Sequence, residues 1–299
     1  MSVLELRSYF EGLRAEFSRL GDRQKGGPGE KEGVKSPVSR SAISVVSFLA
    51  LAMCIPSSFL AQSTTAAGSL QRHTVRVPFV GCKSDGQVGP VEAPQRQNKI
   101  VAITVESAQR LAYYKSEYGF GVLAPRGWYC FGTYGSNGST LYVSPEPINP
   151  VDLFSTTWKG FTGPVIQISD EIGDTSGRFG VAKTIARVFP AYKAFVKSVI
   201  AEGIEPASSF PFGPYPNDKL TYRSKEIVEF QTPANIEGLG TDPWLQKNGD
   251  PIIGVAILMG QEHDLLQLSV RLPPKLTDLT STIIQQVERD AARPAYREK

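Results

Sequence analysis

The sequence is poor in the side chains that most often carry metal or nucleophilic chemistry, because its 299 residues include three cysteines and two histidines. It contains no C-x-x-C redox pair and no G-x-S-x-G nucleophile motif. His73 and His263 are too few to supply the several ligands that a metal site needs. We therefore expect no metal, no cofactor and no catalytic residue, and a non-enzymatic role is favoured.

Most of the chain also lacks an excess of charge of either sign. Residues 64–299 carry 24 Lys and Arg against 23 Asp and Glu, so the net charge of +3 for the whole chain falls to +1 in this part. Nucleic acids and anionic membranes attract proteins through a basic surface. We therefore expect no binding to nucleic acid, and none to a membrane once the signal described next is cleaved.

One long apolar run occurs, within residues 41–60. Basic residues precede it and a turn at Pro56 with small residues follows it, which is typical of a secretory signal peptide. We assign this signal to residues 34–63, without a defined cleavage position. A retained membrane anchor is one alternative, although serines and Pro56 interrupt the roughly 20 apolar residues that a span needs. Lipoprotein processing at Cys54 is the other.

The segment before the signal, residues 1–33, is charged and rich in glycine towards its end. A signal peptide normally begins near its basic residues. Val34 is therefore a candidate for the true start, encoded by a GTG codon, and residues 1–33 would then be an untranslated leader. The alternative is a genuine extension, because residues 4–20 have helical periodicity.

Two cysteines remain once the signal is removed. An even pair in an oxidising compartment predicts one disulfide, Cys82–Cys130. A crosslink that closes a loop of this length stabilises a fold by roughly 4 kcal/mol in the chain-entropy model. Signal and disulfide together predict a periplasmic or extracellular protein.

Hydrophobic patterns and turn residues predict the order of helices and strands in the exported part. Alternation predicts strands at 73–82, 99–105, 119–130, 131–145 (a hairpin), 163–173, 220–232, 252–260 and 265–272. Helical spacing predicts helices at 107–118, 178–203 and 276–291, with Pro190 interrupting the second.

This order, rich in hairpins and without a repeated βαβ unit, predicts an α+β fold. We expect a single domain in which an antiparallel sheet is flanked by helices as an α/β/α sandwich. The domain would span residues 99–290. A segment at 64–98 would be tethered to it through Cys82, and a polar tail would follow at 291–299.

The segment at 118–128, YGFGVLAPRGW, resembles the opening strand of PsbP-like domains, in which an aromatic-Gly-aromatic start leads to a Pro-x-x-Trp corner. The long helix, the hairpin ending in LLQLSVRLPP and the closing helix are also similar to that family, over about 113–290. The resemblance implies a non-enzymatic α/β/α sandwich that binds or helps to assemble partners. The chain departs from the family in the Cys82 segment and in two Pro-rich loops, and no functional residue can be transferred.

Aromatic side chains crowd the first hairpin and the turn before it. Most of them should belong to the core, but several exposed together would form an apolar patch suited to a partner or ligand. The candidate binding residues are Trp128, Tyr129, Phe131, Tyr134 and Tyr142.

The charged residues that could carry catalysis or metal binding are expected instead to be solvated surface residues. Asp170, Glu171 and Asp174 could act as acids or bind Ca²⁺, but a solvated turn at a strand end is favoured. His263 lies in a predicted turn, which is a poor place to hold a catalytic imidazole. The basic side of the second helix is expected to be a solvated face, with an acidic partner as the alternative; it comprises Lys183, Arg187, Lys193 and Lys197.

The sequence thus favours an exported, non-catalytic binding or assembly protein of the bacterial cell envelope, with an unidentified protein or small ligand as its partner. An envelope hydrolase using carboxylates or His263 is one alternative, and a structural accessory subunit is another. An enzyme should have a deep pocket with converging polar groups. A binding module should have a shallow aromatic groove, and a structural subunit a large flat apolar face.

Overall fold

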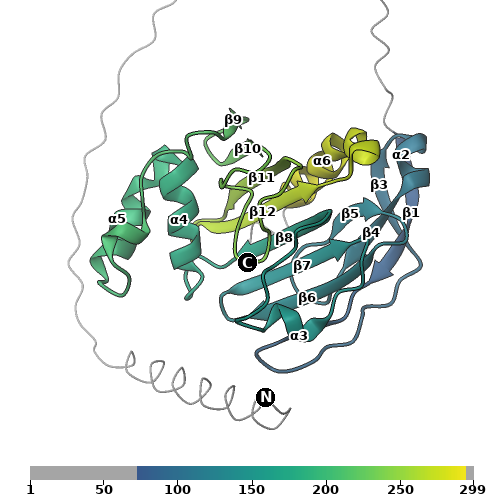
Figure 1. Cartoon of the computed structure of the whole chain (residues 1–299), viewed down its shortest axis with the longest axis horizontal. Coiled ribbons are helices and arrows are strands. Elements are labelled where there is room, and N and C mark those ends of the chain that lie inside the picture. Colours follow the sequence, from purple (N-terminus) through teal and green to yellow (C-terminus); the bar gives the residue numbers. More distant parts are fainter. Residues whose placement is uncertain (1–72, 294–299) are drawn as a thin grey trace, which may run out of the picture. The chain divides into compact units, whose positions relative to one another are not determined.

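The computed structural model of the protein describes residues 73–293 (Figure 1). The predicted extension 1–33, the predicted signal peptide 34–63 with Cys54, and the end of the polar tail lie outside these residues. Helices of the described part are α2 (Val105–Arg110), α3 (Pro150–Leu153), α4 (Arg178–Val188), α5 (Lys193–Ala201) and α6 (Thr280–Ala291). None of them is long and apolar enough to cross a membrane.

The larger of two sheets has eight strands. In spatial order they are β2 (Ser84–Gly86), β6 (Tyr129–Gly135), β7 (Gly138–Ser144), β8 (Val165–Glu171), β12 (Asp264–Arg271), β11 (Ile252–Met259), β10 (Ile227–Thr232) and β9 (Lys219–Tyr222). Neighbouring strands are antiparallel, apart from β2, which joins β6 in parallel at one edge. The hairpins expected from the sequence are therefore present.

The smaller sheet has four strands. In spatial order they are β3 (Asn98–Ile103), β1 (His73–Gly81), β4 (Leu111–Lys115) and β5 (Val122–Pro125). Here β1 pairs antiparallel with β3 and parallel with β4. The segment before residue 99 thus supplies β1 to this sheet and β2 to the larger one. The turn at Arg126–Gly127, where glycine takes a positive φ of 81°, leads from β5 into the larger sheet.

The prediction of a helix at 107–118 is confirmed only up to Arg110 and is wrong beyond it. Helix α2 begins after Thr104, whose side chain accepts a hydrogen bond from the Ser107 amide, and it ends at Arg110. The next five residues form β4, and its first four are buried. A short apolar run that is paired on both sides belongs to a buried strand, and sequence periodicity alone cannot distinguish it from a buried helix.

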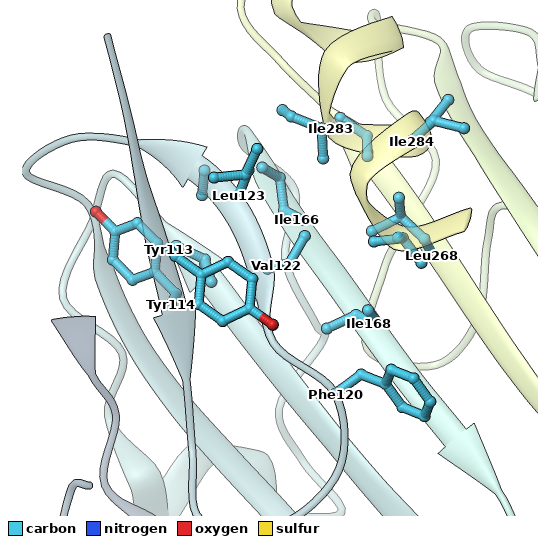
Figure 2. Packing of buried hydrophobic residues seen from close by; sticks show 14 of the residues in the cluster. Tyr113, Tyr114, Phe120, Val122, Leu123, Ile166, Ile168, Leu268, Ile283 and Ile284 are labelled. Atoms are coloured by element: carbon cyan, nitrogen blue, oxygen red, sulfur yellow. The ribbon is translucent and has the colours of Figure 1, made fainter. Parts of the chain in front are cut away.

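The first face of the larger sheet packs against the smaller sheet and α6. Alternate residues of β7, β8, β11 and β12 point to this side and form one cluster with residues of β4, β5 and α6. Figure 2 shows Ile166 and Leu268 of the larger sheet in this cluster, with Leu123 of β5 and Ile283 of α6. All four are at most 2% exposed, so this is a closed hydrophobic core.

The opposite face packs against α4 and α5, whose buried residues form a second cluster with residues of β10, β11 and β12. Figure 1 shows α4 next to one end of β12. The predicted break at Pro190 is confirmed: α4 ends at Val188, a 3₁₀ turn spans Pro190–Tyr192, and α5 follows. Proline has no amide hydrogen to donate, so it stops the hydrogen-bond ladder of α4. The two short helices then bury Ile185 and Val196 against the sheet.

The protein therefore has an α+β fold built on two sheets, with helices as a minor share. A sandwich with helices alone on both faces is not confirmed, because the four-stranded sheet covers part of the first face. The predicted disulfide is present: Cys82 lies between β1 and β2, Cys130 lies in β6, and the crosslink ties the segment after β1 to the larger sheet. Such a bond is consistent with an oxidising, exported environment.

Candidate ligand-binding cleft

Helices α4 and α5 leave part of the opposite face of the larger sheet uncovered. This part is the floor of a cleft of about 740 Å³. Strands β6, β7, β8 and β12 form this floor. Its walls are α4 with the segment 208–215, and the segment 239–244 together with the end of α3. Ligand sites in proteins are concave and have volumes in this range, so the cleft is the candidate functional site.

The floor is polar because of strand alternation. In β8, Ile166 and Ile168 point into the closed core, so Gln167 and Ser169 point to the opposite face. Paired strands repeat this pattern, and a row of polar side chains runs across the sheet. In register, its members are Thr133, Thr140, Ser169 and Gln267.

Gln167 is buried in the floor, with 6% of its surface exposed. Its amide nitrogen donates to Asp242 in the wall formed by the segment 239–244. Among the described residues its Oε1 atom has no hydrogen-bond partner. A buried acceptor that lacks a donor costs about 1–3 kcal/mol, so a ligand that supplies a donor to this oxygen would recover that cost.

Asp242 is positioned by its own loop. Its Oδ1 atom accepts hydrogen bonds of 2.7 Å from the backbone amides of Trp244 and Leu245. Trp244 is held in turn by a 3.2 Å hydrogen bond from its indole nitrogen to the Leu153 carbonyl oxygen. The residue remains 41% exposed. The loop therefore presents a rigid carboxylate and an aromatic ring at the cleft.

Glu171 is the second buried acceptor of the cleft, and the expected solvated turn is wrong for it and for Asp170. Both belong to β8, and Asp170 accepts a hydrogen bond from the Ser139 hydroxyl. Burial raises the pKa of Glu171 to about 7; Lys183 opposes the rise, and the negative charges of Asp242 and Asp170 add to it. Its Oε2 atom has no hydrogen-bond partner among the described residues.

The Glu171 carboxyl lies against Gly180 of α4. A Cβ atom at position 180 would be 2.1 Å from Glu171 Oε2, closer than any side chain allows. Glycine inside a helix costs roughly 1 kcal/mol relative to alanine. The glycine therefore makes room for the carboxyl between the sheet and the helix.

Two cations of the expected solvated face also line the cleft: Lys183 is exposed and Arg187 is half-buried. Lys183 forms an ion pair of 2.9 Å with Glu205. The Arg187 guanidinium stacks on the Tyr215 ring at 4.1 Å and donates to the Gly213 carbonyl oxygen. The other two members of the predicted basic face, on α5, are exposed: Lys193 and Lys197.

Arg271 links the loops that support the 239–244 wall of the cleft. It is fully buried, and its guanidinium donates to the carbonyl oxygens of Phe161, Gly163 and Gln246. Burial lowers its pKa to about 10. The residue thus joins two loops next to Asp242, so it is a positioning residue for the wall.

The five aromatic candidates do not form one patch. Phe131 and Tyr142 are buried around Leu153; Tyr142 also lines the cleft, and burial raises the pKa of its hydroxyl. Tyr134 lines the cleft, stacks on Tyr118 at 4.3 Å and donates to the Gly89 carbonyl oxygen.

The other two aromatic candidates lie apart from the cleft. Tyr129 is exposed, and Trp128 lines a separate pocket of about 500 Å³ with Arg126. His263 does not line the cleft either. Its ring stacks on Phe195 at 4.9 Å, in the turn between β11 and β12.

Sequence reasoning missed Gln167, Gln267, Asp242 and Trp244. The alternation in β8 marked Gln167 and Ser169 as one face, but a polar face normally predicts contact with water. Asp242 and Trp244 lie in a connection without any pattern. Within residues 73–293, no group of three or more His, Cys, Asp or Glu side chains is arranged to hold a metal ion.

Comparison with protein-family models, with curated proteins and with solved structures finds no match to this chain. The resemblance to PsbP-like domains thus stays a prediction. The cleft itself is the basis for a functional proposal.

Proposed function

We propose that the protein is an exported, non-catalytic binding protein of the bacterial cell envelope, in the periplasm or outside the cell, and that its ligand occupies the cleft. The predicted signal and the disulfide support export. The observation that carries the proposal is the pair of buried acceptors in the cleft lining, Gln167 Oε1 and Glu171 Oε2, neither of which has a partner within residues 73–293.

The physical reason is the cost of leaving such atoms unpaired. Native proteins satisfy nearly all their buried polar atoms, and the exceptions concentrate where a ligand or a bound water completes the hydrogen bond. Two unpaired acceptor atoms lie on β8 in one cleft, which indicates a ligand with several hydrogen-bond donors. The other polar side chains of the floor form further hydrogen bonds with that ligand, and binding needs no covalent step.

The PsbP-like resemblance supports the same proposal, because that family implies partner binding without catalysis. The α/β/α sandwich of the family is the finer fold assignment that goes with it. Helices α4 and α5 on one face and α6 on the other would be its helical layers. The four-stranded sheet would be an addition to that plan.

The test measures ligand-induced stabilisation. The full chain is expressed in an oxidising bacterial host, purified, and heated with and without the small-molecule fraction of an envelope extract. We expect the extract to raise the melting temperature of the wild type and of a control, Gln261→Met in an exposed turn, and to leave Gln167→Met unchanged. Equal shifts in both variants, or no shift in the wild type, would refute the proposal.

A second candidate function is an envelope hydrolase, and Glu171 is the observation that favours it. A carboxyl with a pKa of about 7 in a polar cleft suits general acid–base catalysis near neutral pH. The converging polar groups are also those expected of an enzyme rather than of a shallow aromatic groove. Turnover of a ligand found in the extract, abolished by Glu171→Gln, would select this candidate over binding alone.

A structural accessory subunit receives less support. Such a subunit would present a large flat apolar face. Exposed large apolar side chains of the described residues come from separate elements, such as Ile100 of β3, Val151 of α3 and Ile204 after α5. Single exposed apolar residues are normal on a protein surface.

A further inference from the structure

The positions of the polar groups in the cleft indicate which class of ligand it binds. This inference rests on the proposed function. Gln167, Ser169 and Glu171 follow one another on the same face of β8, so they lie roughly 7 Å apart and span about 13 Å along the strand. Across the sheet, the row from Thr133 to Gln267 covers three interstrand steps, which is about 14 Å. A ligand that meets all these groups is extended and polar over its whole length.

The charges of the cleft argue against an anionic ligand. Two cations line it, Lys183 and Arg187, and Lys183 is paired with Glu205. Three carboxyl side chains also line it, those of Asp170, Glu171 and Asp242, so the lining has no excess of positive charge. Asp242 is satisfied by two backbone amides and Gln167. Groups that bind phosphate or carboxylate ligands are usually arginine clusters or bidentate arginines, and the cleft has neither.

An extended peptide fits the floor poorly. Its backbone amides and carbonyls would need partners, which peptide-binding proteins usually offer at a free sheet edge. The floor strands β6, β7, β8 and β12 are each paired on both sides, so they offer no edge. The floor therefore offers only side chains to the ligand.

An oligosaccharide fits these conditions. Each sugar hydroxyl is both a donor and an acceptor, and amide, carboxyl and hydroxyl side chains complement such groups. The faces of a sugar ring are lined by C–H groups, which pack against the electron-rich face of an aromatic ring. Trp244, anchored at both its backbone and its indole nitrogen, presents such a ring at the cleft.

We propose that the cleft binds a neutral oligosaccharide of more than one sugar unit, with Gln167 Oε1 and Glu171 accepting hydrogen bonds from its hydroxyl or N-acetyl N–H groups and Trp244 packing against a ring face. The monosaccharide contacts only one part of this surface and binds weakly. No covalent step is required.

The test uses the purified full-chain product and an array of neutral hexose and N-acetylhexosamine oligosaccharides of two to five units, with their monosaccharides. The best oligosaccharide is then titrated by calorimetry and by tryptophan fluorescence. We expect it to bind at least tenfold more tightly than its monosaccharide. Gln167→Met and Trp244→Ala should each weaken binding at least tenfold, whereas Gln261→Met and Tyr222→Ala, both at exposed positions, should not.

Circular dichroism melting in the absence of sugar separates loss of binding from loss of folding. If Trp244→Ala is unfolded, Trp244→Leu, which keeps apolar bulk but has no aromatic ring, replaces it. Absence of binding across the array overturns the oligosaccharide inference. In that case, stabilisation by envelope extract that depends on Gln167 would still support the cleft as a ligand site, and loss of both results would overturn the proposed function as well.

Discussion

Replacing Glu171 by glutamine is the most direct test of the electrostatics of the cleft. Burial raises the pKa of this carboxyl from 4.5 to about 7, so the folded protein holds its proton more tightly than the unfolded chain does. Stability therefore falls as pH rises from about 4.5 to about 7, because the unfolded chain loses the proton first. At 1.36 kcal/mol for each pKa unit, the contribution of Glu171 to the stability of the wild type falls by roughly 3 kcal/mol between these limits.

The Glu171→Gln variant has no proton to lose and nearly the same shape. We expect its free energy of unfolding to match the wild type at pH 4 and to exceed it at pH 8 by on the order of 3 kcal/mol. Urea denaturation at pH 4, 6 and 8 measures the difference. Glu117→Gln, at an exposed position, is the control and should change stability little at any of these values.

The comparison between variant and wild type isolates Glu171 from its neighbours. Asp170 also has a raised pKa, caused first by burial, but it is present in both proteins and its contribution cancels. A gain in stability that is the same at pH 4 and pH 8 would refute the reasoning. So would a variant less stable than the wild type at pH 8, since that result requires a favourable role for the charged carboxylate.

Three further outcomes are expected from the same denaturation assay. Changing Cys82 and Cys130 to serine together should lower stability by roughly 4 kcal/mol, and a loss below about 1 kcal/mol would contradict it. Arg271→Met should cost on the order of 3 kcal/mol, because three carbonyls lose their donor, and an unchanged midpoint would disprove this role. Gly180→Ala should push the Glu171 carboxyl towards the cleft and return its pKa towards 4.5. The stability of this variant should then depend less on pH than that of the wild type, and an unchanged pH dependence would contradict the role given to Gly180.

The patterns that predicted correctly are local ones. Pro190 ends α4 because it cannot donate to the helix, whatever surrounds it. The pair Cys82 and Cys130 was the natural disulfide because no other cysteine follows the predicted signal peptide. Alternation in β8 identified a strand and separated Ile168 from its polar neighbours.

The errors arise where distant segments decide the outcome. Residues 111–115 have a helix-like pattern but lie between β1 and β5, and pairing on both sides makes them a strand. Export, the PsbP-like assignment and the true start at Met1 or Val34 remain predictions, because the sequence patterns that suggest them lie outside the described residues or lack a match.

By itself the sequence determined the α+β class, the helix break and the disulfide, because each follows from backbone chemistry or from which residues are present. Only the tertiary structure turned the polar face of β8 into a cleft. Gln167 meets Asp242, 75 residues later in the chain, and the proton affinity of Glu171 depends on the helix that covers it. Alternation sets which side chains share a face, whereas what covers that face depends on packing between segments far apart in the sequence.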